Sequence, residues 1–199
     1  MAANDTFDEK QGLPILPFAS QRHWEDWPDQ HHQSSKGLWL KIAKRGAGVD
    51  TVTYDQALET ALRFGWIDGQ KAALDDTHWL QRFTPRGPRS KWSKINRDKV
   101  TQLIAANAMR PAGLAAVEQA KRNGAWEQAY DGQSRATVPD DLRQALDQST
   151  AAAAFFDTLN SVNRYAIIYR LSDAKKPETR ARRIAQFIAM LERGEKLYP

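Results

Sequence analysis

The chain has 199 residues, no cysteine and a formal net charge of +5. Without cysteine there can be no disulfide framework, thiolate metal site or thiol nucleophile. No apolar run approaches the roughly 18 residues that a membrane span needs. The polar, acidic N-terminus lacks the basic segment and apolar core of a signal peptide, so we expect a cytoplasmic location.

Positive charge is concentrated in two segments. Residues 82–99 carry seven basic side chains against Asp98 alone, and residues 164–196 carry nine basic against four acidic. Such segments attract phosphate, nucleic acid or anionic lipid. Charge runs are also common on ordinary solvated surface, so both interpretations stay open.

The first 35 residues are expected to form an N-terminal arm and a short helix. Pro14 and Pro17 favour a loose arm over about the first 20 residues. Ser20 can begin a short helix, which Pro28 is expected to stop.

Residues 36–135 are expected to form an α+β domain. Alternating apolar and polar residues predict strands at 38–43 and 78–84, with a short strand or turn at 66–75 between them. Thr53 is a predicted N-cap for a helix that ends at Gly65. The sheet is expected to be small, and either mixed or antiparallel.

After about Ser93 the apolar period changes from 2 to 3.6, which predicts helices. Pro111 and Pro139 stand at expected helix starts, and Gly124 and Gly194 at expected helix ends. Residues 136–199 are therefore expected to form a helical C-terminal domain, and the fold class is α+β.

The segment from Gly65 to Asn96 is the densest in tryptophan, arginine and polar side chains. Both residue types are costly to bury without partners, so we expect a shaped polar-aromatic surface here. Asp68 either forms a turn before Gly69 or pairs with Arg82, which when buried needs a carboxylate or a bound anion. The predicted site holds a small anion or an acidic group of a partner, and its residues are Trp66, Asp68, Lys71, Arg82, Arg86, Trp92, Ser93 and Asn96.

Two alternative functions remain open. The first is an enzyme of unassigned reaction that uses Asp68 as acid or base in a cleft with Arg82. The second is nucleic-acid binding through residues 82–99 and 176–183, since basic segments with tryptophan suit single strands. The side chains expected to carry that binding are Arg89, Lys91, Lys94, Arg97, Arg180 and Arg183. No histidine has metal-ligand spacing and no phosphate-binding or dinucleotide loop is present, so we expect neither metal nor cofactor.

Five segments together resemble a known family: GWIDGQ, LQRFTPR, SKWSKIN, RPAGLAAVEQAKRNGAW and KKPETRARRIAQFIAML. They resemble the YdeI/OmpD-associated family, also called OmdA-like and described as bacteriocin-protection proteins. The resemblance spans about Lys36 to Leu197, with residues from about Asp140 like the family's C-terminal domain. It implies a link to resistance against bacteriocins or cationic peptides and to an outer-membrane porin, through a role in stress tolerance. The family is described as periplasmic, and this chain departs from that in lacking a secretion signal.

Overall fold

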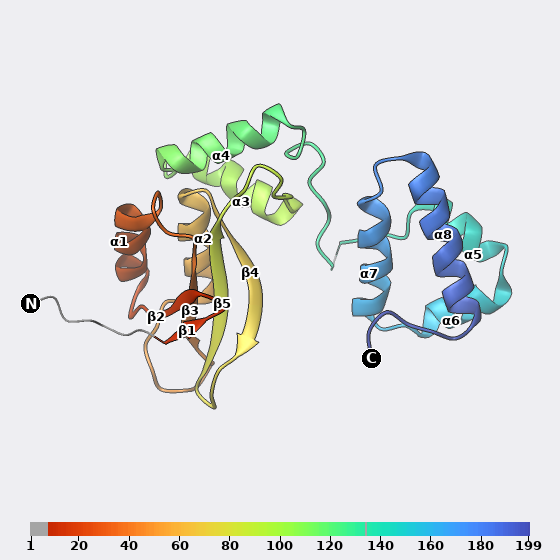
Figure 1. The fold of residues 1–199 in the computed structure, drawn as a ribbon, viewed down its shortest axis with the longest axis horizontal. Coiled ribbons are helices and arrows are strands. Elements are labelled where there is room, and N and C mark those ends of the chain that lie inside the picture. The colour runs from red at the N-terminus through yellow and green to blue at the C-terminus, as the bar shows by residue number, and fades with distance from the viewer. Residues whose placement is uncertain (1–7, 134) are drawn as a thin grey trace, which may run out of the picture. The chain divides into compact units, whose positions relative to one another are not determined.

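The computed structural model describes residues 8–133 and 135–199, so the first seven residues of the expected arm lie outside it. The chain forms two compact units. The first comprises the chain up to Trp92 together with Asn96–Ala129, and the second comprises Ser93–Ile95 and Tyr130–Pro199. The predicted α+β class is confirmed, with a mixed sheet in the N-terminal half and a helical C-terminal half (Figure 1).

The first unit is built on a five-stranded sheet in the order β1-β2-β3-β5-β4. Its strands are β1 (Glu9–Lys10), β2 (Leu13–Pro17), β3 (Leu38–Ala43), β4 (Trp66–Ala73) and β5 (His78–Pro85). β2 and β3 pair in parallel, and every other neighbouring pair is antiparallel. The predicted strands at 38–43 and 78–84 are confirmed as β3 and β5. The segment expected as a short strand or turn is the strand β4.

The expected loose arm is wrong over Leu13–Pro17, which adds a strand to the sheet. Leu13 and Leu16 are buried there, and their burial outweighs the two prolines, whose missing N–H groups weaken the pairing of the strand. β1 also closes over Trp39, whose Nε1 donates to the Lys10 carbonyl oxygen at 2.9 Å.

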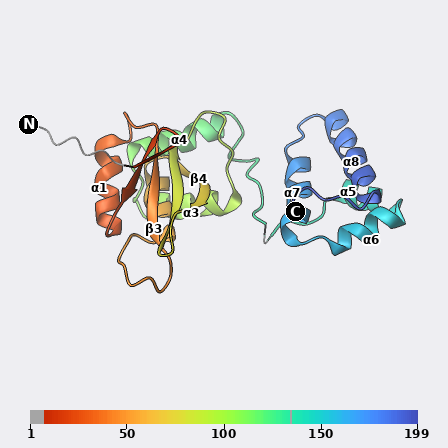
Figure 2. The same cartoon turned by 60° about the horizontal axis from the view of Figure 1, so that its bottom comes forward.

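One face of the sheet is covered by α1 (Gln21–His31) and α2 (Tyr54–Arg63), as Figures 1 and 2 show. The core between them is apolar and aromatic, and includes Trp24, Leu40, Leu62, Trp66 and Phe83. The predicted caps are confirmed: the Ser20 side chain accepts from His23 N, and Thr53 forms a reciprocal capping box with Gln56. The expected stop at Pro28 is wrong, because α1 continues to His31 with Pro28 buried inside it.

A bulge interrupts the pairing of β4 with β5 between Asp68 and Lys71. The buried Gln81 side chain donates from Nε2 to the carbonyl oxygens of Gly69 and Gln70, at 2.9 and 3.3 Å. The bulge therefore supplies acceptors to the buried Gln81 amide, as a buried polar group requires.

The remaining helices of the first unit are α3 (Lys94–Ala105), which belongs to it from Asn96 onward, and α4 (Pro111–Arg122). α4 packs on α2 with little space between them. A Cβ on Gly65 would lie 2.9 Å from the Ala112 carbonyl oxygen, and a Cβ on Gly113 would meet the Arg63 carbonyl. Both glycines are required by this close approach.

The second unit is helical, with α5 (Asp140–Asp147), α6 (Thr150–Thr158), α7 (Ser161–Ser172) and α8 (Pro177–Glu192). Ser149 caps α6 and Asn160 caps α7, and Gly194 follows α8 with φ of +68°. Its apolar core contains Leu142, Leu146, Phe156, Ile167, Leu171 and Leu191, among others.

Polar contacts pin two parts of this unit. Asn163 is 1% exposed, and its side chain accepts from Tyr198 N at 2.9 Å and donates to the Tyr198 carbonyl oxygen at 3.3 Å. Arg180 on α8 forms a two-pronged ion pair with Asp141 on α5 and also donates to the Leu171 carbonyl oxygen at 2.8 Å.

Candidate functional site

The first unit contains a cavity of about 320 Å³ beside the end of β5, which we name the Trp-Arg cavity. Three of the predicted site residues line it, namely Trp66, Arg86 and Trp92. Trp66 opens β4 directly after Gly65, and its ring meets the Trp27 ring edge-on at 5.8 Å. The full lining is His32, Phe64, Gly65, Trp66, Pro85, Arg86, Gly87, Pro88, Ser90, Trp92, Ala112, Ala116, Gln119, Ala120 and Asn123.

Arg86 lies flat against Trp92, with the guanidinium carbon 3.6 Å from the centroid of the ring. Its backbone N–H donates to the Gly65 carbonyl oxygen at 3.0 Å, and its Nη1 donates to the Lys91 carbonyl oxygen at 3.0 Å. The Trp92 ring is buttressed edge-on by Trp126 at 4.9 Å. The guanidinium is therefore fixed in position, and stacking leaves its N–H donors directed along its edge.

The rim of the cavity is a turn from Gly87 to Ser90. Ser90 N donates to the Gly87 carbonyl oxygen at 2.9 Å, and the Ser90 hydroxyl accepts from Gly87 N at 3.0 Å. The Asn123 side chain ties this turn to the end of α4 by donating to the Pro88 carbonyl oxygen at 2.7 Å. The turn is what folds Arg86 back over Trp92.

The expected partnership of Asp68 with Arg82 is wrong. Asp68 pairs in register with Phe83, so it shares the helix-covered face of the sheet. Arg82 is the next residue along β5 and lies opposite Trp39, on the other face. No hydrogen bond or ion pair joins them among the described residues. A cleft with both residues, which the enzyme alternative needs, is therefore not formed.

Asp68 instead accepts a hydrogen bond from the Tyr54 hydroxyl at 2.8 Å. Burial, reinforced by this carboxylate, raises the pKa of Tyr54 above its usual range. Lys71 lies over the Trp79 ring, 4.3 Å from the centroid. Asp68 and Lys71 belong to β4 and Arg82 to β5, and none of the three lines the Trp-Arg cavity.

Ser93 and Asn96 also do not line the cavity. Ser93 groups with the second unit, where it forms a bridge with Tyr130, and Asn96 is buried at the start of α3. The predicted site thus converges in Trp66, Arg86 and Trp92 only, and ligand binding by them stays a prediction.

The basic residues of the nucleic-acid alternative are partly occupied by internal contacts. In the second unit Arg180 pairs with Asp141, Arg183 donates to the Arg170 carbonyl oxygen, and Lys94 lies 2.7 Å from Asp131. In the first unit Arg97 lies 3.7 Å from Asp98, while Arg89 and Lys91 are exposed. Arg180 and Arg183 therefore help to hold the helical unit together, and nucleic-acid binding by residues 176–183 stays a prediction.

Sequence reasoning missed the wall that α4 gives to the cavity. Ala112, Ala116 and Ala120 line it, and they are spaced four residues apart, so they share one face of the helix. In the sequence, the regular spacing of these alanines next to Gly113 was the signal that this face of α4 can pack closely against another part of the fold.

The described part of the chain holds no group of three or more His, Cys, Asp or Glu side chains that could bind a metal ion. Within the same residues, no helix combines the length and apolarity needed to cross a lipid bilayer.

Two family profiles match the chain. Residues 16–116, just over half of the chain, match a family described as a domain of unknown function, DUF8412. Residues 135–194 match the family described as "Bacteriocin-protection, YdeI or OmpD-Associated". The resemblance drawn from the sequence is thereby confirmed over the helical unit, and most of the first unit matches a different family. No curated protein and no solved structure matches the chain.

Proposed function

We propose that the chain, which belongs to the DUF8412 family and carries a YdeI/OmpD-associated domain at residues 135–194, is a non-enzymatic binding protein. Its first unit would hold a small anion in the Trp-Arg cavity. The observation that carries this proposal is the Arg86 guanidinium, stacked 3.6 Å from the Trp92 ring on the cavity wall.

The charge of the lining supports an anionic ligand. Arg86 is the one residue with a permanent charge among the described residues that line the cavity, and neither Asp nor Glu is among them. Guanidinium matches the planar geometry of carboxylate and the oxygens of phosphate. A volume of about 320 Å³ suits a small molecule rather than a polymer.

The surroundings of Arg86 favour tight binding because they are already ordered. The stack on Trp92 and the hydrogen bond to the Lys91 carbonyl restrict the side chain before any ligand arrives. Binding then costs less side-chain entropy than it would for a mobile surface arginine. The rings of Phe64, Trp66 and Trp92 offer apolar contact to the rest of the ligand.

The test is a titration of the full chain with phosphate, sulfate and benzoate, followed by tryptophan fluorescence. We expect saturable binding of at least one anion, and about a tenfold or greater loss of affinity in Arg86→Gln, since a hydrogen bond to a charged group contributes about 1.5–3 kcal/mol. Arg89→Gln is the matched control, because Arg89 is exposed, three residues away and absent from the cavity lining. Equal losses in both variants would reduce the effect to general surface charge and overturn the proposal.

A second variant addresses the cavity without touching the charge. Ala116→Leu places an isobutyl group into the space beside α4. We expect it to block the anion while Arg86 and Trp92 remain in place. Unchanged affinity in this variant would place the anion elsewhere on the protein.

We propose stress tolerance as the setting of this binding, and the support is the description of the family matched by residues 135–194. An acidic group of a partner protein is the alternative ligand for the same arginine. Survival of a bacterial host under cationic peptide, with and without the chain and with Arg86→Gln, tests the role. Equal survival of the three strains would contradict a role in stress tolerance.

A further inference from the structure

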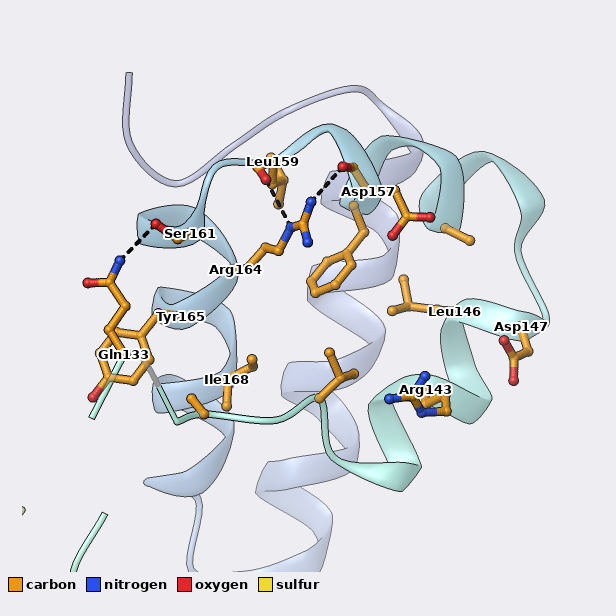
Figure 3. A pocket seen from close by; sticks show the side chains of 14 residues that line it. Gln133, Arg143, Leu146, Asp147, Asp157, Leu159, Ser161, Arg164, Tyr165 and Ile168 are labelled. Carbon is orange, nitrogen blue, oxygen red and sulfur yellow. Dashed lines mark hydrogen bonds between the residues drawn. The ribbon is translucent and has the colours of Figure 1, made fainter. Parts of the chain in front are cut away.

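The second unit contains a larger cavity, of about 560 Å³, that the proposal above does not use (Figure 3). α5, α6 and α7 and the segment before α5 line it. Part of its lining is apolar, and that part includes the buried side chains of Leu146, Phe156 and Leu159 and the half-buried Val138 and Ile168.

One cation is held at this cavity by the backbone. Arg164 on α7 donates from Nε to the Leu159 carbonyl oxygen at 2.9 Å and from Nη2 to the Asp157 carbonyl oxygen at 2.6 Å, as Figure 3 shows. Both acceptors lie at the C-terminal end of α6, where helix carbonyls lack partners within the helix. Its guanidinium carbon also lies 5.9 Å from the Phe156 ring.

This anchoring uses one edge of the guanidinium. The described structure gives Nη1 no hydrogen-bond partner, and the edge formed by Nη1 and Nη2 remains for a ligand. A guanidinium held in place by two carbonyl oxygens can donate two parallel hydrogen bonds to one carboxylate.

The other charges of the lining are Arg143, Asp147 and Asp157, and all three residues are exposed. Exposed charges are screened by solvent and salt, so they contribute less than the half-buried Arg164. Together with Arg164 they give two positive and two negative side chains. That balance disfavours phosphate dianions and polyanions, while it tolerates a ligand with a single negative charge.

We propose that this cavity binds a small amphipathic monocarboxylate. The carboxylate pairs with the outer edge of Arg164, and the hydrocarbon part lies against Leu146, Phe156 and Ile168. The ligand class follows from one fixed cation beside the apolar part of the lining.

The test compares three molecules that share one hydrocarbon chain, namely octanoate, octylammonium and octanol, on the full-length protein. Methyl NMR is the readout, because Val138, Leu146 and Ile168 report from inside the cavity. We expect saturable shifts of these methyl signals with octanoate, and at least about tenfold weaker binding of the other two, the loss expected when a charged hydrogen bond is removed. Equal binding of octanol or octylammonium would overturn the assignment, as would octanoate shifts confined to methyl groups outside the cavity.

Two variants locate the binding. Arg164→Gln should lose octanoate affinity by about tenfold or more, but it also removes contacts to the end of α6. Ala153→Leu leaves Arg164 untouched and fills the cavity from α6, so it should abolish binding while the methyl spectrum stays that of a folded protein. Arg182→Gln is the control and should change affinity little, because Arg182 is exposed and does not line the cavity. Octanoate binding that survives in folded Ala153→Leu protein would overturn the proposal.

Discussion

Gly113→Ala tests how closely α4 approaches α2. A Cβ at this position would meet the Arg63 carbonyl oxygen, and would lie 2.9 Å from the Arg63 carbonyl carbon and 2.7 Å from Met109 Cε. The same carbonyl oxygen accepts from Arg110 N at 3.0 Å, so it cannot retreat without loss. The added methyl group must therefore push α4 away from α2.

Two effects of this substitution have opposite signs, which makes the result decisive. Alanine stabilises a helix by about 1 kcal/mol over glycine, whereas overpacking costs about 1–3 kcal/mol, and more when backbone must move. We expect a net loss of about 1–2 kcal/mol, which corresponds to a Tm about 2–8 °C lower for a chain of this size.

Tryptophan fluorescence is the right assay, since all seven tryptophans belong to the first unit. The control is Ala115→Gly on the exposed side of α4, where only helix propensity changes and about 1 kcal/mol should be lost. A Gly113→Ala protein that melts at or above the wild-type temperature would show that the contact is absent, and would refute the reasoning.

Three further predictions concern charges and buried polar groups. Glu25 lies 2.9 Å from Arg63 and 3.0 Å from Arg110, so Glu25→Gln should destabilise the first unit by about 1–3 kcal/mol in a fluorescence melt, with exposed Glu59→Gln as a control near zero. Asn163→Ala should cost about 1–3 kcal/mol in a calorimetric melt, because the buried amide holds the Tyr198 backbone; an unchanged melt would show that the C-terminal contact is not formed. Burial, with Tyr130, Tyr169 and Asp131 nearby, raises the pKa of Tyr165 to about 12 from 10.0, so this hydroxyl stays protonated to a higher pH in the folded state than in the unfolded state. The stability that this raised pKa gives the folded state is fully present below pH 10.0 and is lost as the pH rises toward 12. Tyr165→Phe should therefore flatten the fall of Tm over this window, and a pH profile of Tm identical to that of the wild type would contradict the raised pKa.

Local patterns of the sequence predicted much of the fold. The alternation in β3 and the capping box at Thr53 are encoded by neighbouring residues, and both are found where expected. The N-terminal strand was missed because two prolines are a strong local signal against a strand. The burial of Leu13 and Leu16 is a tertiary effect, and it decides against that signal.

The candidate site was only partly predictable, because it depends on a turn and on strand register. The density of tryptophan and arginine correctly indicated the segment that contains Trp66, Arg86 and Trp92. Composition does not reveal which face of a strand a residue occupies, so Arg82 and Asp68 were wrongly brought together. The stack of Arg86 on Trp92 exists because the chain folds back at Gly87–Ser90, and that turn is held by Asn123 from a distant helix.

The two cavities share no lining residue and belong to different units, and the two units match different families. Each proposal can therefore be tested with the other site as its internal control. Arg86→Gln should weaken binding of the small anion and leave octanoate affinity within about twofold, while Arg164→Gln should do the reverse, since sites without shared partners behave independently to within about 0.5 kcal/mol. Calorimetric titration of both variants with both ligands measures this directly. Loss of both ligands in a single folded variant would mean that one site binds both, and the separate assignments would then be wrong.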